Sequence, residues 1–296
     1  MKITALVVTY NRLELLKENI KALLKIKKEG LIQNIIVVDN NSDADTKLFL
    51  ERISDIHYVR LNKNLGGAGG FNAGIKTFYK EFDDDAVWIM DDDTIPNLDT
   101  VRELRNAADE HENFGFLLSN ALWIDNTPCK MNVPMPNLNR WTEDFQDKTI
   151  TVPLLRGSFV SMLVSRDAVR KVGYPITDFF VWGDDVNYSE RISKCLSGYF
   201  VPTSVVIHKM KNNVSTDIVK DDFSRIPRYY YAFRNDFYNS RKRSFRDGMK
   251  FFVHSFIEAA RVLKNSKDCK FKRISTIFKG LFAGIIFNPS IEKVKD

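Results

Sequence analysis

ITALVVTYNRLELLKENIKALLKIKKEGLIQNIIVVD, residues 3–39, decides the fold class. Its first eight residues are apolar and mostly β-branched, which is typical of a buried strand. Residues 13–27 then place leucine and isoleucine at helical spacing among lysines, and residues 33–39 form a second apolar run. A strand, a helix and another strand in this order predict two parallel strands joined by a right-handed crossover.

The same alternation continues along the first half of the chain. We expect a helix at 43–53, a strand at 57–61, a helix at 70–82 and a strand at 86–90. The predicted fold class is therefore α/β, with a mostly parallel central sheet flanked by helices. Ligands of such sheets bind beyond the carboxyl ends of the strands. The polar residues expected at that edge are 9–12, 39–42, 62–64 and 91–93.

The second half of the chain is less regular. A polar stretch at 124–153 predicts a loop-rich insertion near the site. Strands are expected at 159–164 and 199–208, and helices at 166–172 and 186–196.

Composition and charge exclude several classes of protein. An apolar fraction of 44% excludes a disordered chain. Three cysteines without a CxxC pair indicate neither a disulfide framework nor a zinc ribbon, so a reducing cytoplasm is expected. The sequence has no signal-peptide pattern and no apolar run long enough to span a bilayer. The net charge of +6 conceals a basic tail, because residues 241–296 hold 14 Lys and Arg but only 5 Asp and Glu.

The motif WIMDDD at residues 88–93 places three consecutive carboxylates at the end of an apolar strand. A bound cation would relieve their repulsion, and carboxylate oxygens suit Mg²⁺ or Mn²⁺, ions that stabilise a leaving diphosphate. The alternative is a solvated acidic turn before the next helix. A second acidic triplet at 83–85 precedes the strand instead of following it, and we expect that triplet to be solvated.

Two further motifs have both a functional and a structural interpretation. Five glycines lie within nine residues of NKNLGGAGGFNAG, residues 62–74, where backbone N–H groups approach an anion or sugar; a tight turn explains them equally well. In FFVWGDDVNYSER, residues 179–191, adjacent carboxylates open a helix. They either complement the helix dipole or supply a general base, with Trp182 as a stacking face for a sugar.

The chain contains, in this order, the motifs VVTYNR, VVDNNS, NLGGAGGFNAG, WIMDDD and WGDD and a histidine that ends the last strand. Together and in this order they resemble the motifs of the inverting family-2 glycosyltransferases of the GT-A fold. Within that family the chain is most similar to the UDP-galactofuranose transferases, with rhamnosyltransferases close behind. The resemblance covers roughly residues 1–240. It implies a catalytic domain at 1–239, with a nucleotide-sugar half at 1–95 and an acceptor half at 96–239, and a basic amphipathic helical tail at 240–296.

The resemblance also implies a role for each matching residue. Asp93 and His208 are expected to bind a divalent metal, Mn²⁺ or Mg²⁺, and Asp185 to act as the general base that deprotonates an acceptor hydroxyl. Trp182 and Asp184 are expected to bind the acceptor. The nucleotide sugar is expected to contact seven residues: Thr9, Arg12, Asp39, Asn64, Gly67, Asp91 and Asp92.

Two positions depart from the pattern of the galactofuranosyl enzymes. Those enzymes carry Trp-Asp-Asp followed by another acid two residues on. In this chain Gly183 intervenes after the tryptophan and Asn187 replaces the additional acid. Both departures lie on the acceptor side of the implied site.

The basic tail contains two amphipathic stretches. Residues 241–264 and 270–285 each place large apolar residues on one helical face and Lys or Arg on the other. Such helices fit an anionic membrane surface; the alternative is packing on the catalytic body with a solvated basic face. The segregation of the two faces argues against nucleic acid. We expect peripheral attachment to the inner face of the cell membrane.

The sequence thus predicts a transferase that moves galactofuranose from UDP-galactofuranose to a cell-surface glycan, expected to be lipid-linked. The alternatives are transfer from dTDP-rhamnose or a UDP-hexopyranose, and a non-catalytic, membrane-associated protein that binds nucleotide sugars or glycans. A sugar-nucleotide pyrophosphorylase would need a glycine-rich loop after the first strand, and VVTYNR is not one. A binding protein would not need Asp185 and His208 beside the acidic edge.

Overall fold

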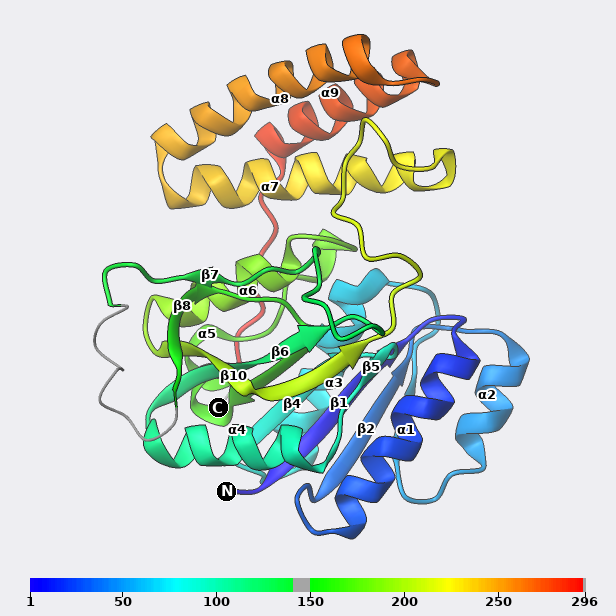
Figure 1. The fold of residues 1–296 in the computed structure, drawn as a ribbon, viewed down its shortest axis with the longest axis vertical. Coiled ribbons are helices and arrows are strands. Elements are labelled where there is room, and N and C mark those ends of the chain that lie inside the picture. The colour runs from blue at the N-terminus through cyan, green and yellow to red at the C-terminus, as the bar shows by residue number, and fades with distance from the viewer. Residues whose placement is uncertain (141–149, 295–296) are drawn as a thin grey trace.

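The computed structural model describes residues 1–140 and 150–294, and it contains a sheeted body and a separate layer of helices (Figure 1). Residues 141–149, which belong to the predicted insertion, lie outside the described part. The sheet has the order β3-β2-β1-β4-β9-β6-β10-β8-β7, and β5 pairs with β10. Its strands are β1 (Ile3–Thr9), β2 (Asn34–Asp39), β3 (His57–Arg60), β4 (Ala86–Asp91), β5 (Thr94–Ile95), β6 (Phe114–Leu122), β7 (Met135–Pro136), β8 (Val152–Arg156), β9 (Ser161–Ser165) and β10 (Ser197–His208).

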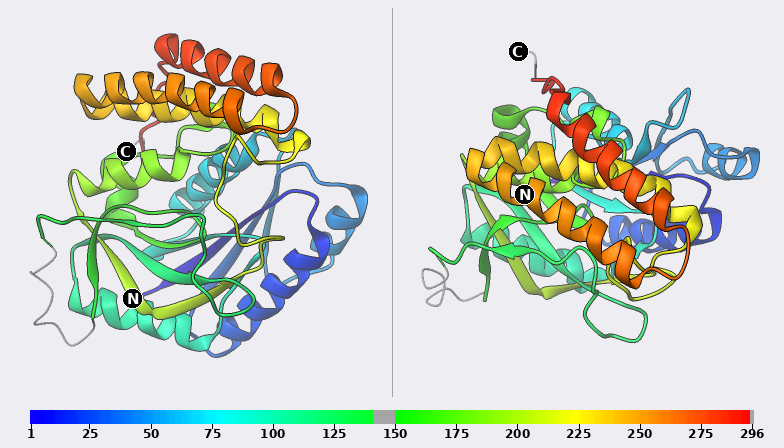
Figure 2. Two further views of the ribbon diagram at one scale, coloured as in Figure 1. Left: turned by 45° about the horizontal axis from the view of Figure 1, so that its top comes forward. Right: turned by 90° about the horizontal axis from the view of Figure 1, so that it is seen from above.

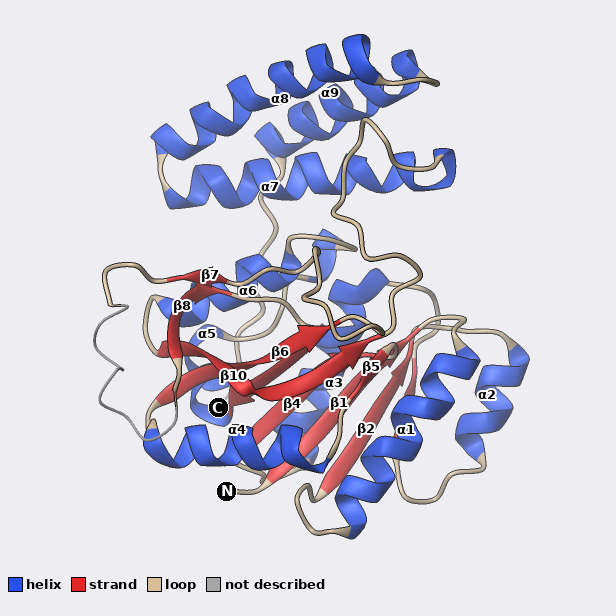
Figure 3. Ribbon diagram, viewed as in Figure 1, coloured by secondary structure: helices blue, strands red, loops and turns tan. Residues whose placement is uncertain are grey.

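Helices cover both faces of this sheet, as Figure 3 shows. The predicted α/β class is confirmed. The helices of the body are α1 (Leu13–Lys28), α2 (Ala44–Glu51), α3 (Gly66–Glu81), α4 (Leu98–Glu110), α5 (Arg166–Val172) and α6 (Asp184–Ser193). Two short 3-10 helices are η1 (Thr177–Phe179) and η2 (Phe223–Arg228).

Strands β3, β2, β1 and β4 are parallel, as their apolar runs predict. Their registers align Thr9 with Asp39 and Val8 with Asp91, so the carboxyl ends of β1, β2 and β4 lie at one edge. Alternate residues of β1 contribute to two cores. Ile3, Ala5 and Val7 belong to the core that contains residues of α1 and α4, whereas Leu6 and Val8 belong to the core that contains residues of α3. Strand β9 is antiparallel to both β4 and β6, which makes the second half of the sheet mixed.

The prediction that the acidic triplet at 83–85 is solvated was wrong for Asp84. This residue is 5% exposed, and its carboxylate accepts hydrogen bonds from the Thr4 hydroxyl at 2.6 Å and the Asn34 amide at 2.9 Å. Asp85 in turn accepts a hydrogen bond from the backbone N–H of Lys2. The triplet therefore ties together the starts of β1, β2 and β4, where polar partners from neighbouring strands offset the cost of burial.

The C-terminal region forms a three-helix bundle of α7 (Tyr229–Arg243), α8 (Phe245–Asn265) and α9 (Lys270–Ile286). Helix α7 lies between the body and the other two helices (Figures 1 and 2). After α9 the chain returns to the body, where the backbone carbonyl of Glu292 accepts a hydrogen bond from Tyr174 N at 3.0 Å. The predicted domain division stays a prediction, and a boundary between residues 239 and 240 would fall inside α7. Among the described residues no helix is long and apolar enough to span a bilayer.

Candidate active site

Three potential metal ligands meet where β4 and β10 end. Asp91 is the last residue of β4 and His208 the last of β10. Strand β5, which follows directly after Asp93, pairs antiparallel with β10 and aligns Thr94 with His208. One ligand atom from each of Asp91, Asp93 and His208 lies within 4.8 Å of the others, and His208 Nε2 is 3.2 Å from Asp93 Oδ1. The structure thus brings together the two predicted metal ligands and adds Asp91.

The donor set fits a divalent metal. Asp93 and His208 are 5% and 4% exposed; His208 Nδ1 has no hydrogen-bond partner, and His208 Nε2 is the one described partner of Asp93 Oδ1. Burial and the charge of Asp93 raise the pKa of Asp91 to about 8, which shows how strongly the fold disfavours the adjacent charges. Burial would lower the pKa of His208, but the hydrogen bond and charge of Asp93 outweigh burial and raise it. Two carboxylates and one imidazole would suit Mn²⁺ or Mg²⁺.

The first loop of the body contacts the acidic motif. The Thr9 hydroxyl donates to Asp92 Oδ2 at 2.7 Å, and the Arg12 guanidinium lies 3.2 Å from Asp92 and 2.6 Å from Asp93. Thr9 and Asp92 are buried, while the Arg12 side chain is 49% exposed. The structure therefore places Thr9, Arg12 and Asp92 at the predicted edge. Their contacts with a nucleotide stay a prediction.

Asp39 at the end of β2 is fully buried, and both of its oxygens have partners within the protein. Oδ1 accepts the N–H of Ser42 at 2.7 Å, while Oδ2 accepts the Tyr58 hydroxyl at 2.9 Å and pairs with Arg60. Tyr58 and Arg60 were not predicted as site residues. Arg60 ends β3 and is the second-last residue of the strand predicted at 57–61, and that position near the ligand-binding edge is the signal that would have identified it.

The glycine segment contains a tight turn at Gly66 and an open backbone at Gly67, while its contact with a ligand stays a prediction. Gly66 has φ +72°, and a side-chain carbon there would lie 1.9 Å from the backbone oxygen of Phe180. Asn64 accepts the N–H of Gly66 at 2.8 Å, and Asn40, which was not predicted, donates to the Gly66 carbonyl at 2.7 Å. At Gly67, in contrast, a side-chain carbon would have no atom within 4 Å, so a ligand can approach this backbone.

The predicted base lies on the first turn of α6, after a strained loop. Phe180, Trp182 and Gly183 have φ angles of 63°, 64° and 81°. Asp184 and Asp185 open the helix, and burial raises the pKa of Asp184 to about 8 and of Asp185 to about 6. Because burial disfavours two adjacent negative charges, it favours a state in which this pair holds one proton and one carboxylate stays available as a base.

The glycine segment contacts the loop at residues 179–183, which we call the acceptor loop because acceptor binding is predicted there. The backbone N–H of Ala68 in α3 donates to the Phe180 carbonyl at 3.2 Å, and Gly66 lies against the same residue. Trp182, the predicted stacking residue, is only partly available. The edge of its ring contacts Tyr229 at a centroid distance of 5.2 Å, and the Arg225 guanidinium lies 5.8 Å from its centroid.

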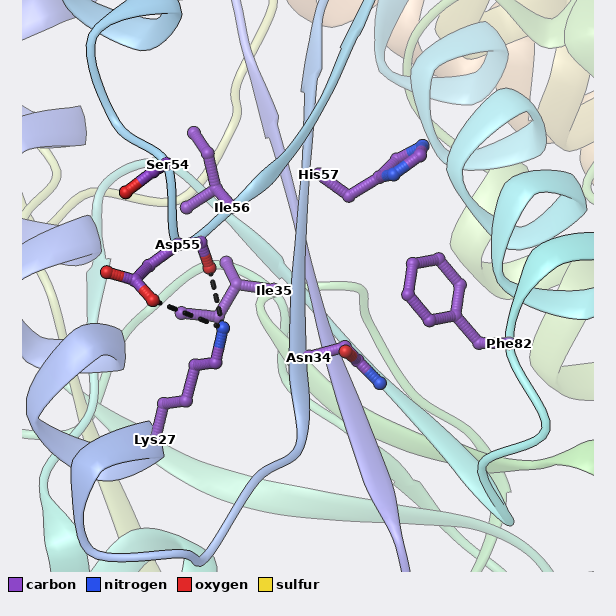
Figure 4. A pocket seen from close by; sticks show the side chains of 8 residues that line it. All are labelled: Lys27, Asn34, Ile35, Ser54, Asp55, Ile56, His57 and Phe82. Carbon is purple, nitrogen blue, oxygen red and sulfur yellow. Dashed lines mark hydrogen bonds and ion pairs between the residues drawn. The ribbon is translucent and has the colours of Figure 1, made fainter.

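Cavities lined by described residues also lie outside this centre. A cavity of about 850 Å³ opens between the segments that follow β6 and β10; its lining includes Trp123, Asp125, Cys129 and Asn213. The indole N–H of Trp123 is held by the backbone oxygen of Met210, two residues after His208. The second cavity, of about 220 Å³, is lined by Lys27, Asn34, Ile35, Ser54, Asp55, Ile56, His57 and Phe82 (Figure 4). It lies where β2 and β3 begin, at the end of the sheet opposite the metal ligands.

Sequence comparisons show which proteins the chain is similar to. The family model Glycosyl transferase family 2 matches residues 4–173. The chain is 27% identical over 199 residues to Galactofuranosyltransferase GlfT1 of Mycolicibacterium smegmatis, covering 64% of this chain and 65% of the relative. It is 23% identical over 172 residues to the Low-salt glycan biosynthesis hexosyltransferase Agl10 of Haloferax volcanii, covering 54% and 53%. The chain spans less than two thirds of the length of either relative.

Solved structures share the fold. A crystal structure of GalNAc-T7 with UDP, GalNAc and Mn²⁺ has a TM-score of 0.59 at 12% identity and covers 81% of this chain and 50% of that one. The structure of S. aureus TarS has a TM-score of 0.56 at 14% identity, covering 97% and 44%. These similarities confirm the predicted GT-A fold. Since the family model matches more than half of its residues, the chain belongs to glycosyl transferase family 2.

Proposed function

We propose that the protein is an inverting, metal-dependent glycosyltransferase that transfers galactofuranose from UDP-galactofuranose to a glycan hydroxyl. The observation that carries this proposal is the buried cluster of Asp91, Asp93 and His208, in a fold whose glycine segment contacts the loop before Asp185. A nucleotide-binding protein without catalytic activity would not need a carboxylate pair directly after that loop.

The reaction is a single displacement. Asp185 takes the proton of the acceptor hydroxyl while the hydroxyl oxygen attacks the anomeric carbon from the face opposite UDP. Burial and the charge of Asp185 raise the pKa of the neighbouring Asp184, which favours a single negative charge on this pair. Arg12 lies next to Asp92 and Asp93, where its positive charge also favours the departing diphosphate. A divalent metal, when bound, would neutralise the charge that develops on that diphosphate.

The choice of donor sugar rests on similarity. The relative that matches over 199 residues is named a galactofuranosyltransferase, and the second relative is named a hexosyltransferase. The motif pairing of the sequence favours galactofuranose as well. Transfer from dTDP-rhamnose or a UDP-hexopyranose is the alternative, because no described contact distinguishes one sugar ring from another.

We further propose that the bundle attaches the protein to an anionic membrane at the inner face of the cell membrane. Large apolar side chains are exposed along α8 and α9, and ring contacts join the two helices, with Phe256 and Phe278 at a centroid distance of 5.0 Å. We call this set the apolar face of the bundle: Phe245, Met249, Val253, Phe256, Ile257, Leu263, Phe271, Phe282, Ile285 and Ile286.

Position and charge support a membrane as the partner of the apolar face. Helices α8 and α9 lie on the side of α7 that faces away from the body (Figure 1). Helices α8 and α9 also carry basic side chains that are exposed or partly exposed, namely Arg246, Lys250, Lys264, Lys270, Lys272 and Lys279. Exposed apolar area bordered by Lys and Arg is typical of helices that lie in an anionic lipid interface. A lipid-linked glycan acceptor would be presented at the same surface.

The donor is tested by measuring UDP or dTDP release from purified protein with Mn²⁺ and a lipid-extract acceptor. UDP-galactofuranose, UDP-galactopyranose, UDP-glucose and dTDP-rhamnose are compared. We expect turnover with UDP-galactofuranose alone, lost in Asp93→Ala and Asp185→Asn. Turnover with another donor would change the proposed donor sugar but leave the proposed mechanism in place. Tight binding of a nucleotide sugar without any release would instead support a non-catalytic binding protein.

A further inference from the structure

The two positions at which the sequence departs from the galactofuranosyl pattern both contact helix α7. Asn187 donates from its amide to Asn239 Oδ1 at 3.0 Å. A side-chain carbon on Gly183 would lie 3.3–3.4 Å from atoms of three α7 residues: Asn235, Asp236 and Asn239. Any larger residue at 183 would push against α7 and would also have to adopt φ +81°. Gly183 and Asn187 therefore allow α7 to pack directly on the acceptor loop.

Helix α7 fixes the conformation of that loop through two buried amides. Asn235 is 0% exposed, and its Nδ2 donates to the backbone oxygens of Phe179, Val181 and Trp182 at 2.9, 3.1 and 2.7 Å. Asn239 Nδ2 donates to the Gly183 oxygen at 2.9 Å. These bonds fix the loop in which Phe180 and Trp182 have positive φ angles that are otherwise costly. Helix α7 is thus structurally part of the site.

Asp236 lies between these two asparagines in the sequence and faces the same loop. Its Oδ1 is 3.4 Å from the position of a side-chain carbon on Gly183. Among the described residues no group forms a hydrogen bond or ion pair with its carboxylate. Arg156 and Arg243, whose charges act on Asp236, instead pair with Glu190 at 3.2 and 2.8 Å. Asp236 is partly exposed, so its carboxylate is open to solvent, and a hydroxyl of a ligand would take the place of that water.

We propose that Asp236 is an acceptor-binding residue whose carboxylate accepts a hydrogen bond from a hydroxyl of the acceptor sugar held beside Asp185. This inference rests on the proposed transferase function. Asp236 is an additional acid beside the pair Asp184 and Asp185, and it comes from α7. The related enzymes carry their additional acid at the position that Asn187 occupies in this chain. A sugar carries several adjacent hydroxyls, so one can face Asp185 while its neighbour binds Asp236.

The charges around Asp236 make its role measurable. Burial and the charges of Asp185 and Glu190 raise its pKa to about 6, while Arg243 and Arg156 oppose them. Removing its charge removes a negative neighbour of Asp185, which is a change that a folding defect would not mimic. The acidic limb of the pH profile of kcat/KM should therefore move to lower pH in Asp236→Asn.

The test is a binding titration that needs no turnover. Purified full-length protein, loaded with UDP and Mn²⁺, is titrated with n-octyl β-D-galactofuranoside, n-octyl β-D-galactopyranoside and n-octyl α-L-rhamnopyranoside. Asp236→Asn should weaken binding of whichever glycoside the wild type prefers by about tenfold or more, since a charge-assisted hydrogen bond is lost. Its affinity for UDP should not change. Asp109→Asn, an exposed carboxylate on α4, should match the wild type in both titrations.

Each result has a definite meaning. Equal glycoside affinity in Asp236→Asn and the wild type would overturn the inference, as would a wild-type protein that binds UDP but none of the three glycosides. Weaker glycoside binding with unchanged UDP binding would support it. If glycoside binding depends on Asp236 but no donor is turned over, the transferase proposal fails while Asp236 remains a glycan-binding residue.

Discussion

At the scale of single residues, the site is defined by carboxylates that the fold places close together. Asp91 and Asp93 lie beside His208, while Asp184 and Asp185 open α6. Burial raises the pKa of Asp91, Asp184 and Asp185 to about 8, 8 and 6. Groups with such shifts are typical of functional sites. The two sets are expected to differ in role, because only the first has a histidine ligand.

His208→Ala should weaken metal binding. The variant removes one of three candidate ligands, so the Mn²⁺ dissociation constant measured by isothermal titration in the presence of UDP should rise by about 100-fold. His57→Ala is the matched control, because His57 begins β3 at the opposite end of the sheet and pairs with Glu81. Equal Mn²⁺ affinity in His208→Ala and the wild type would contradict the metal site.

The pH dependence of kcat/KM should show an acidic limb near pH 6. Asp185 acts as a base only when ionised, and burial raises its pKa to about 6 even though two backbone N–H groups and Arg156 oppose that shift. Activity should therefore rise from pH 5 to 7. Arg156→Met removes a positive charge near Asp185 and should move the limb to higher pH. If the acidic limb of kcat/KM lies at the same pH in Asp185→Glu and Arg156→Met as in the wild type, another residue is the base.

At the scale of elements, the segment from residue 62 to α3 positions the donor side and the acceptor loop together. Gly66 turns the chain at φ +72° and contacts Phe180, while Gly69, Gly70 and Gly74 lie against other side chains of the body. Only Gly67 of this group is open to a ligand. One glycine-rich sequence therefore combines a turn, close helix packing and a ligand-accessible backbone.

Gly66→Ala should destabilise the fold, whereas Gly67→Ala should not. At position 66 the added carbon meets the Phe180 backbone and the φ angle is unfavourable, so the free energy of unfolding should fall by about 2 kcal/mol or more. Alanine at 67 occupies open space in the first turn of α3 and should leave the thermal midpoint unchanged or slightly raised. Thermal unfolding of both variants measures this difference.

Gly67→Ala also tests the predicted donor contact. If the nucleotide sugar approaches this backbone, the added methyl group should weaken UDP-sugar binding without loss of stability. Unchanged affinity would remove Gly67 from the donor site. The same titration on Gly66→Ala cannot separate binding from folding, which is why Gly67 is the informative position.

At the scale of the whole molecule, the bundle connects the proposed membrane surface to the acceptor loop. Helix α7 contacts α8 and α9 on one side and supplies Asn235 and Asn239 to the loop on the other. The segment that follows α9 attaches the bundle to the body at a second point, through the hydrogen bond between Tyr174 and Glu292. A surface docked through α8 and α9 would thus lie at a defined position relative to Asp185.

Phe245→Ser with Phe271→Ser should weaken attachment to vesicles. These side chains are 84% and 89% exposed, so their loss should not change the thermal midpoint. Each Phe that enters lipid contributes about 1.5–3 kcal/mol, and cosedimentation with phosphatidylglycerol vesicles should fall by more than tenfold. Leu48→Ser on α2 is the control, because Leu48 is also exposed and lies on the body. Wild-type protein that stays in the supernatant would contradict the membrane proposal.

The sequence by itself determined the alternating strands and helices of the first half and the edge at which the acids lie. Apolar runs of strand length and helical periodicity are local patterns, so β1, α1, β2 and β4 follow from them. The placement of WIMDDD after such a run identified Asp91 and Asp93 for the same reason. The role of His208 was implied by resemblance, since a single histidine has no local pattern of its own.

Only the tertiary structure decided which distant residues share the site. The pairing of β5 with β10 brings His208 to Asp93, and the packing of α7 brings Asn235 and Asp236 to Gly183. Asp84 is buried for a similar reason, because its partners Thr4 and Asn34 come from other strands. Such contacts depend on how separate elements dock, and hydrophobic periodicity fixes which face is buried but not which polar residue lies opposite it.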